Sequence, residues 1–311
     1  MKLLTHNDLD GYGCRFVLDN IYNFETIIHS NYEDISEYLK AIKLNSKDKI
    51  LLITDLNFKK ENIKEMLNLL KDGWKIRYFD HHKYDENILK IFEKLKKYDF
   101  KYIIDTNRSA TKIVFDTFKH KLKLNEQKLK NLTSLVEIIN TYDLWKLESP
   151  LWDKAFAINN IFYLVGENNF YRKVSKNEFV ILNEFKEQYK EYIKRKNQYF
   201  NYLKEKGNII ANDNILLVIM ESYEFSSFVT FEFPNYQHYI IVYPFANRIS
   251  LRHRDISEEE MEKKFNKLIQ ITHPKINSIG GHLFAQGITL YNDTKIEDLY
   301  EIIEMIGNIL K

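Results

Sequence analysis

Short apolar runs near the start of the chain each end on acidic or histidine side chains, and each run is followed by a helical pattern. The runs cover residues 2–4, 50–53 and 76–79, and the polar clusters after them begin at His6, Asp55 and Asp80. Each run is too short for a helix, so the pattern predicts alternating strands and helices, which build a parallel sheet. Ligands of such sheets bind at the carboxyl ends of the strands, where the strand order reverses. We therefore expect the three clusters to meet at one edge.

The remaining pattern predicts two domains of the α/β class. A further strand is expected over residues 101–105, a helix over about 125–142, and one long helix over 170–207. Strands at 215–219, 239–243 and 248–252 and helices at 258–269 and 296–310 follow. The prediction is a five-stranded, mainly parallel sheet domain (1–165), a helical connector (166–207) and a smaller α/β domain (208–311).

Composition excludes several classes of protein. The chain has 311 residues and a single cysteine, Cys14, so neither a disulfide framework nor a cysteine-rich zinc site is expected. A net charge of +2 does not fit a polybasic nucleic-acid binder. The N-terminus enters a strand directly, and no apolar run has the roughly 18 residues of a membrane span. We expect a soluble, cytoplasmic protein without a membrane partner.

The residue types in the clusters predict a metal centre. If Asp8, Asp10, Asp55 and Asp143 converge, four negative charges share one cleft, and two divalent cations would neutralise them. His6 and one of the histidines after Asp80 add nitrogen ligands, and a bridging carboxylate, here Asp55, holds two ions roughly 3.5–4 Å apart. Mixed nitrogen and oxygen ligation disfavours magnesium and calcium and favours manganese, with cobalt or zinc as alternatives. Water then serves as the nucleophile, so no nucleophile motif is required.

Five motifs resemble those of the DHH/DHHA1 phosphoesterase superfamily, in order and spacing, over nearly the whole chain. They are His6-x-Asp8-x-Asp10-Gly11, Asp55, Asp80-His81-His82, Asp143, and Gly280-Gly281-His282-x-x-Ala285-x-Gly287. The segment from Thr5 to Gly11 is most similar to the bacterial oligoribonuclease, or nanoRNase, branch. The resemblance implies a catalytic DHH domain (1–165) and a substrate-binding DHHA1-like domain (208–311).

The resemblance also implies roles for individual residues. One metal ion would be held by His6, Asp8 and Asp55, and the other by Asp10, Asp55, His81 and Asp143. His82 would contact the scissile phosphate, and Asp80 would orient a neighbouring histidine by accepting its ring proton. One departure concerns His6, which precedes the first aspartate by two residues, whereas several family members place this histidine four residues before it.

In the second domain, the resemblance places the substrate on Gly280, Gly281 and His282. Paired glycines let backbone amides approach a phosphate closely, and the histidine adds a donor. Arg252 resembles the second anion contact of the family, and its guanidinium can bind phosphate bidentately. Arg108 and Ser109 resemble a family segment near the cleft.

Simpler local explanations exist for most of these residues. Asp8 and Asp10 are also typical of a helix N-cap and a first helical turn, and Asp55 of the cap of a helix starting near Lys59. Asp143 fits a turn after a helix, the histidines at 81 and 82 fit a surface loop, and Gly280 and Gly281 fit an ordinary turn. Arg252 fits a surface strand, and Arg108 and Ser109 fit a plain helix start.

The preferred hypothesis is a two-metal phosphodiesterase that degrades short single-stranded oligoribonucleotides or dinucleotides from an end to nucleoside monophosphates, with homodimerisation left open. Three enzymatic alternatives have related chemistry: a 3'-phosphoadenosine 5'-phosphate phosphatase, a cyclic or linear dinucleotide phosphodiesterase, and a single-strand DNA exonuclease. A nucleotide-binding module without turnover is the non-enzymatic alternative. The complete acidic set disfavours that module, because carboxylates crowded in a metal-free cleft cost stability.

Overall fold

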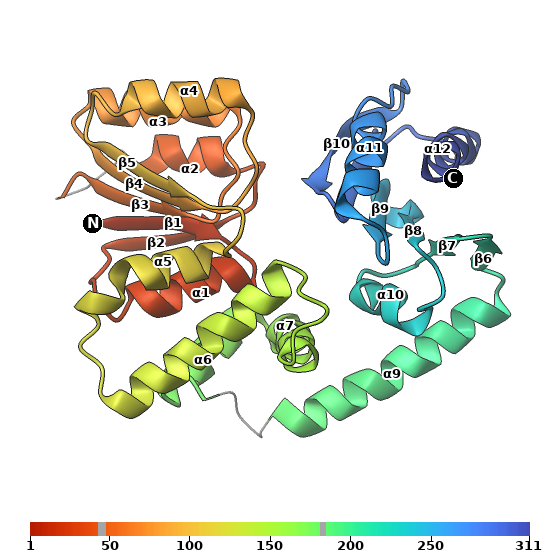
Figure 1. Ribbon diagram of the computed structural model, residues 1–311, viewed down its shortest axis with the longest axis horizontal. Helices are drawn as coiled ribbons and strands as arrows, with labels where there is room; N and C mark the ends of the chain where they lie inside the picture. Colours follow the sequence, from red (N-terminus) through yellow and green to blue (C-terminus); the bar gives the residue numbers. More distant parts are fainter. Residues whose placement is uncertain (43–47, 181–184) are drawn as a thin grey trace. The chain divides into compact units, whose positions relative to one another are not determined.

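The first half of the chain forms a parallel α/β unit. The computed structural model describes residues 1–42, 48–180 and 185–311, which divide into the compact units Met1–Lys190 and Glu191–Lys311 (Figure 1). The sheet of the first unit has the order β2-β1-β3-β4-β5, and every neighbouring pair is parallel. Its strands are β1 (Lys2–His6), β2 (Thr26–Ser30), β3 (Ile50–Thr54), β4 (Lys75–Asp80) and β5 (Phe100–Ile104). The predicted α/β fold is confirmed.

Helices cover both faces of this sheet, which explains why its strands are almost continuously apolar. On one face lie α1 (Leu9–Leu18), α5 (Ala110–Phe118) and α6 (Glu126–Asp143); on the other lie α2 (Ile35–Ile42), α3 (Lys60–Lys71) and α4 (Glu86–Leu95) (Figure 1). Successive strand residues point to opposite faces. Leu3 accordingly belongs to the core cluster under α1, whereas Leu4 belongs to the cluster under α2 and α3.

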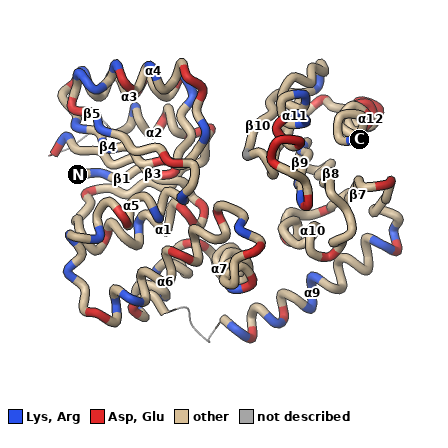
Figure 2. Tube along the Cα trace, in the orientation of Figure 1, with Lys and Arg blue, Asp and Glu red and all other residues tan. Residues whose placement is uncertain are grey.

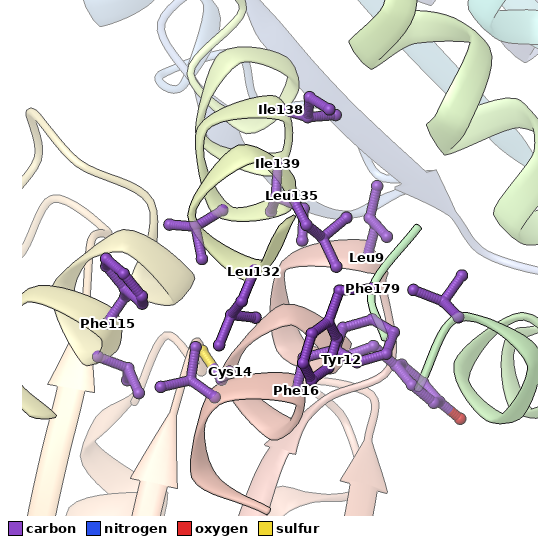
Figure 3. Packing of buried hydrophobic residues seen from close by; sticks show 14 of the residues in the cluster. Leu9, Tyr12, Cys14, Phe16, Phe115, Leu132, Leu135, Ile138, Ile139 and Phe179 are labelled. Atoms are coloured by element: carbon purple, nitrogen blue, oxygen red, sulfur yellow. The ribbon is translucent and has the colours of Figure 1, made fainter. Parts of the chain in front are cut away.

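The core on the α1 face brings the beginning of α1 against the beginning of α5. Figure 3 shows Cys14 and Phe16 of α1 packed with Leu132 and Leu135 of α6. At Gly13 the helices approach so closely that a Cβ atom would lie 2.0 Å from Oγ1 of Thr111. This contact requires glycine, and it places the first turn of α1 beside the N-terminus of α5.

The connector differs from the single helix expected over residues 170–207. The segment contains two separate helices after α7 (Trp152–Val165). The first is α8 (Glu167–Lys176), and the second is α9 (Lys186–Glu205). Glu178 and Phe179 between them have positive φ angles of 55° and 67°, which a continuous helix does not allow. Phe179 and Phe185 of the predicted stripe are buried in the core of the first unit, and Leu182 lies outside the described residues. The α9 helix carries charges of both signs along its length (Figure 2).

The second unit is a mixed sheet with helices, as the sequence predicted. Its strand order is β10-β11-β9-β8-β7-β6, in which only β7 and β8 are parallel. The elements are β6 (Ile209–Asn212), β7 (Ile215–Ile219), α10 (Val229–Glu232), β8 (His238–Tyr243), β9 (Arg248–His253), α11 (Glu258–Leu268), β10 (Ile276–His282), β11 (Ala285–Leu290) and α12 (Ile296–Leu310), with short 3-10 turns. Within the described residues, no helix has both the length and the apolar sequence that crossing a membrane requires.

Candidate metal centre

The predicted polar clusters lie at the carboxyl ends of neighbouring strands. His6 is the last residue of β1, Asp55 directly follows β3, and Asp80 ends β4. The strand order reverses between β1 and β3, because β2 adds on one side and β3 to β5 on the other. This is the position where parallel sheets of this order bind ligands. Asp143, at the end of α6, reaches the same place.

His6, Asp8 and Asp55 form the first group of potential ligands. Nδ1 of His6 lies 2.9 Å from Oδ2 of Asp8 and 3.8 Å from Oδ2 of Asp55. Oδ1 of Asp8 also accepts a hydrogen bond of 2.9 Å from the amide of Gly11 and caps α1. Because a carboxylate has two oxygens, Asp8 both caps the helix and faces the site.

Asp10, His81 and Asp143 form the second group, with ligand atoms within 4.8 Å of one another. Nδ1 of His81 lies 3.4 Å from Oδ2 of Asp143, and its Nε2 lies 3.9 Å from Oδ2 of Asp10. The same Nε2 is 3.3 Å from Oδ1 of Asp55, whose Oδ2 faces His6. The two oxygens of Asp55 therefore face the two groups, as a bridging ligand requires.

The carboxylates of the centre carry more negative charge than the nearby basic side chains and hydrogen-bond donors neutralise. Burial raises the pKa of Asp55 and of Asp143 well above the usual range, and the charges of Asp8 and Asp10 raise both further. Burial opposes protonation of His81, but Asp143 and Asp10 outweigh it and raise its pKa to about 9. Oδ2 of Asp55 and Oδ2 of Asp143 are buried without a hydrogen-bond partner. Divalent cations would satisfy these oxygens, and the mixed carboxylate and imidazole donors fit a transition metal.

Backbone amides of α5 stabilise Asp10. Its Oδ2 accepts a hydrogen bond of 2.8 Å from the amide of Ala110, and its Oδ1 one of 2.9 Å from the amide of Thr111. The positive end of the helix dipole thus faces a buried carboxylate. Ser109 is the N-cap of this helix, and Arg108 pairs with Asp105 at 2.8 Å and with Asp116 at 3.0 Å. The local explanation of this segment holds, and its contact with substrate stays a prediction.

Asp80 holds His82 rather than facing the two ligand groups. Its Oδ1 accepts a 2.8 Å hydrogen bond from Nδ1 of His82. Its Oδ2 accepts hydrogen bonds from the hydroxyl groups of Tyr78 at 3.0 Å and Tyr84 at 2.5 Å. Burial opposes ionisation of Asp80, but His82 outweighs it and lowers the pKa of Asp80 below its usual range. Asp80 therefore fixes the ring of His82, although it lies close enough to Asp55, His81 and His82 to count as a ligand by distance alone.

Three tyrosines in this centre were not predicted from the sequence. Tyr78 and Tyr84 flank the Asp80-His81-His82 segment, and Tyr32, which follows β2, contacts both His6 and His82. The chain contains 21 tyrosines, and no spacing distinguishes these three. For Tyr32 the missing signal was the strand β2 itself, whose half-buried, mixed sequence has no clear apolar pattern.

In the second unit, the glycine–histidine segment and Arg252 are aligned across three strands. Arg252 on β9 pairs with Ala285 on β11, which pairs with His282 on β10. Gly281 has a φ of 127°, and a Cβ atom there would lie 2.4 Å from the carbonyl oxygen of Ala285, so the hairpin requires glycine. Around Gly280 there is open space. The side chain of His282 lies outside the described part of the structure.

Relatives of the chain are phosphodiesterases. The oligoribonuclease NrnB of Bacillus subtilis (strain 168) is 23% identical over 324 aligned positions, which cover 96% of this chain and 74% of the relative. A 3',5'-cyclic-nucleotide phosphodiesterase of Helicobacter pylori (strain 26695) is 29% identical over 155 residues, 46% of this chain and 42% of the relative. The chain belongs to the DHH/DHHA1 phosphoesterase superfamily. No family model matches it. The aligned region covers less than half of the length of the Helicobacter phosphodiesterase.

Solved structures show the same fold. RecJ of Thermus thermophilus in complex with Mn2+ superposes with a TM-score of 0.59 at 10% identity, over 99% of this chain and 52% of RecJ. The pGpG-specific phosphodiesterase PggH of Vibrio cholerae superposes with a TM-score of 0.56 at 16% identity, over 99% of this chain and 98% of PggH. At sequence identities this low, the two structures show only that this chain shares their fold.

Proposed function

We propose that this protein is a metal-dependent phosphodiesterase that degrades short oligoribonucleotides from an end to nucleoside monophosphates. The observation that carries the proposal is the position of Asp55, whose two buried oxygens face two separate groups of metal ligands. The oligoribonuclease NrnB, which matches over 96% of this chain, supports the choice of substrate.

In this proposal the chain binds two ions and holds the substrate phosphate beside them. His6, Asp8 and Asp55 would hold one ion, and Asp10, Asp55, His81 and Asp143 the other. When bound, the ions, which we propose to be Mn2+, supply an activated water and neutralise charge on the phosphate. His82 contacts a non-bridging phosphate oxygen, and Asp80 keeps its ring in place through Nδ1. The amides of α5 favour the ionised form of Asp10 and oppose the effect of burial, which raises the pKa of this carboxyl group.

The second unit would bind the terminal nucleotide. Backbone amides at Gly280 and Gly281 can approach a phosphate group closely, and Arg252 lies in the same register row as His282. Binding of one terminal group would favour end-directed cleavage of short substrates. Arg108 and Ser109 remain candidates for a supporting contact near Asp10.

A dinucleotide or cyclic-nucleotide phosphodiesterase is the second candidate. It is favoured by the Helicobacter relative, which is named a 3',5'-cyclic-nucleotide phosphodiesterase and is 29% identical over 155 residues. The two candidates use the same metal centre and differ in the substrate that the second unit accepts.

The deciding experiment compares substrates with the manganese-loaded full chain. An end-labelled RNA trimer should release nucleoside monophosphates stepwise, and 3',5'-cyclic nucleotides and the DNA trimer should react more slowly. The same trimer with either end blocked reports the direction of cleavage. Preferred hydrolysis of cyclic nucleotides would support the second candidate, and tight binding of the trimer without product would indicate a binding module.

Substitution of the paired glycines tests the role of the second unit. Gly280→Ala should leave the melting temperature unchanged, because no atom lies within 4 Å of the added methyl group, but should raise KM about tenfold if phosphate approaches there. Gly281→Ala should lower the free energy of unfolding by about 1–3 kcal/mol, because its φ is 127°. Thermal unfolding and steady-state kinetics on the trimer measure both. An unchanged KM for Gly280→Ala would remove this hairpin from the binding site.

A further inference from the structure

We propose that Tyr32 is a positioning residue that holds His6 and His82 in their working orientations; the inference rests on the proposed function. Tyr32 lies just beyond the end of β2, at the edge of the sheet where β1 and β4 also end. Its ring stacks on the ring of His6, with centroids 4.4 Å apart and an interplanar angle of 24°. Its hydroxyl oxygen lies 3.1 Å from Nε2 of His82.

The side chain of His82 is held through both of its ring nitrogens. Oδ1 of Asp80 lies 2.8 Å from Nδ1 of His82 and, as a carboxylate oxygen, accepts the hydrogen of that nitrogen. Nε2, the ring nitrogen left for phosphate, faces the hydroxyl oxygen of Tyr32 at 3.1 Å, and which of the two atoms donates depends on whether Nε2 carries a hydrogen. Contacts at both nitrogens restrain the plane of the ring.

The face of the Tyr32 ring contacts His6. His6 directs Nδ1 toward Asp8 at 2.9 Å and Asp55 at 3.8 Å, so the orientation of its ring decides whether the first ligand group is complete. The stacked ring of Tyr32 restricts the rotation of the imidazole. Tyr32 thus has two separable parts: the aromatic face supports metal binding through His6, and the hydroxyl supports phosphate contact through His82.

Two substitutions separate these parts. Tyr32→Phe keeps the ring and removes the hydroxyl, whereas Tyr32→Leu removes both. Tyr38→Phe in α2 is the matched control, because Tyr38 packs against the core cluster under α2 and α3. Calorimetric titration with Mn2+ in the absence of substrate measures the metal affinity, and kinetics on the RNA trimer measure kcat and KM.

Tyr32→Phe should lower kcat/KM about tenfold and leave manganese affinity within about twofold of wild type. Tyr32→Leu should show the same loss and, in addition, about tenfold weaker manganese binding, the lower range seen when a group that orients a metal ligand is removed. Tyr38→Phe should match wild type in both measurements. A melting temperature for each variant separates these effects from unfolding.

Wild-type kcat/KM in Tyr32→Phe would overturn the hydroxyl part of the inference. Equal losses of metal affinity in Tyr32→Phe and Tyr32→Leu would overturn the stacking part, because the phenyl ring is retained in the first. If wild-type protein hydrolyses no oligonucleotide, the proposed function fails, and the manganese titration alone still decides whether the ring of Tyr32 supports His6.

Discussion

Asp55→Asn is expected to abolish turnover while making the metal-free protein more stable. Activity should fall by about 10³-fold or more, because the variant loses a carboxylate that faces both ligand groups. Asparagine is the informative substitution, since Asp55 has a φ of 56° and asparagine tolerates this left-handed backbone. The loss therefore reports the missing charge and ligand oxygen, not backbone strain.

The stability effect follows from the pKa of Asp55. The pKa of Asp55 in the folded protein is raised above the unfolded value of 3.8. The free energy of unfolding that this group contributes is therefore fully present below about pH 4 and is lost as pH rises. In protein treated with a chelator, Asp55→Asn should melt at a higher temperature than wild type at pH 8, and the difference should shrink toward pH 4. Added Mn2+ should reverse the order, because it stabilises the protein that binds it.

Asp213→Asn is the matched control for Asp55→Asn. Asp213 also has a positive φ, of 50°, but it is exposed in the turn between β6 and β7. This variant should retain wild-type activity and wild-type melting behaviour with and without metal. Near-normal turnover in Asp55→Asn would show that the two ligand groups do not act through a shared carboxylate.

The sequence predicted the position of the metal centre better than the contacts that hold its side chains in place. Four of the five parallel strands could be located, three of them because burial on both faces makes them continuous apolar runs, and the ends of these three define one sheet edge. His6, Asp55 and Asp80 follow from that rule with no knowledge of the tertiary structure. The placement of Asp143 depended on a long helix of clear periodicity, which the structure contains as α6.

The missed features depend on contacts between distant segments. The amides of Ala110 and Thr111 bind Asp10 only because α1 and α5 pack closely at Gly13, which no local pattern reveals. The separation of α8 from α9 escaped prediction because Phe179 and Phe185 continue a helical stripe, although they are used to fill the core of the first unit. In both cases tertiary packing outweighs local periodicity.

Asp80→Asn is expected to reduce both activity and stability strongly. Asp80 is fully buried and accepts hydrogen bonds from His82, Tyr78 and Tyr84. An amide cannot accept from all three: if its NH2 group faces His82, Nδ1 of the ring must become the acceptor, and the ring proton moves to Nε2. The neutral ring can still donate its Nε2 hydrogen to phosphate, but without the positive charge that the Asp80 carboxylate would stabilise; loss of one donor aimed at developing charge costs about 10²–10³-fold in kcat, which sets the expected scale. Loss of one partner of a buried charged pair costs about 3–5 kcal/mol of stability.

Nitrogen NMR of His82 and denaturant unfolding test Asp80→Asn directly. The wild-type ring should carry its hydrogen on Nδ1, and the variant ring on Nε2. Asp99→Asn is the control, because Asp99 pairs with Arg77 at 2.7 Å near the start of β5 but is largely exposed, and such pairs contribute about 0–1 kcal/mol. If Asp80→Asn kept the wild-type tautomer and kcat, Asp80 would serve the core alone. The Tyr32→Phe kinetics would then show how far Tyr32 contributes to the orientation of His82.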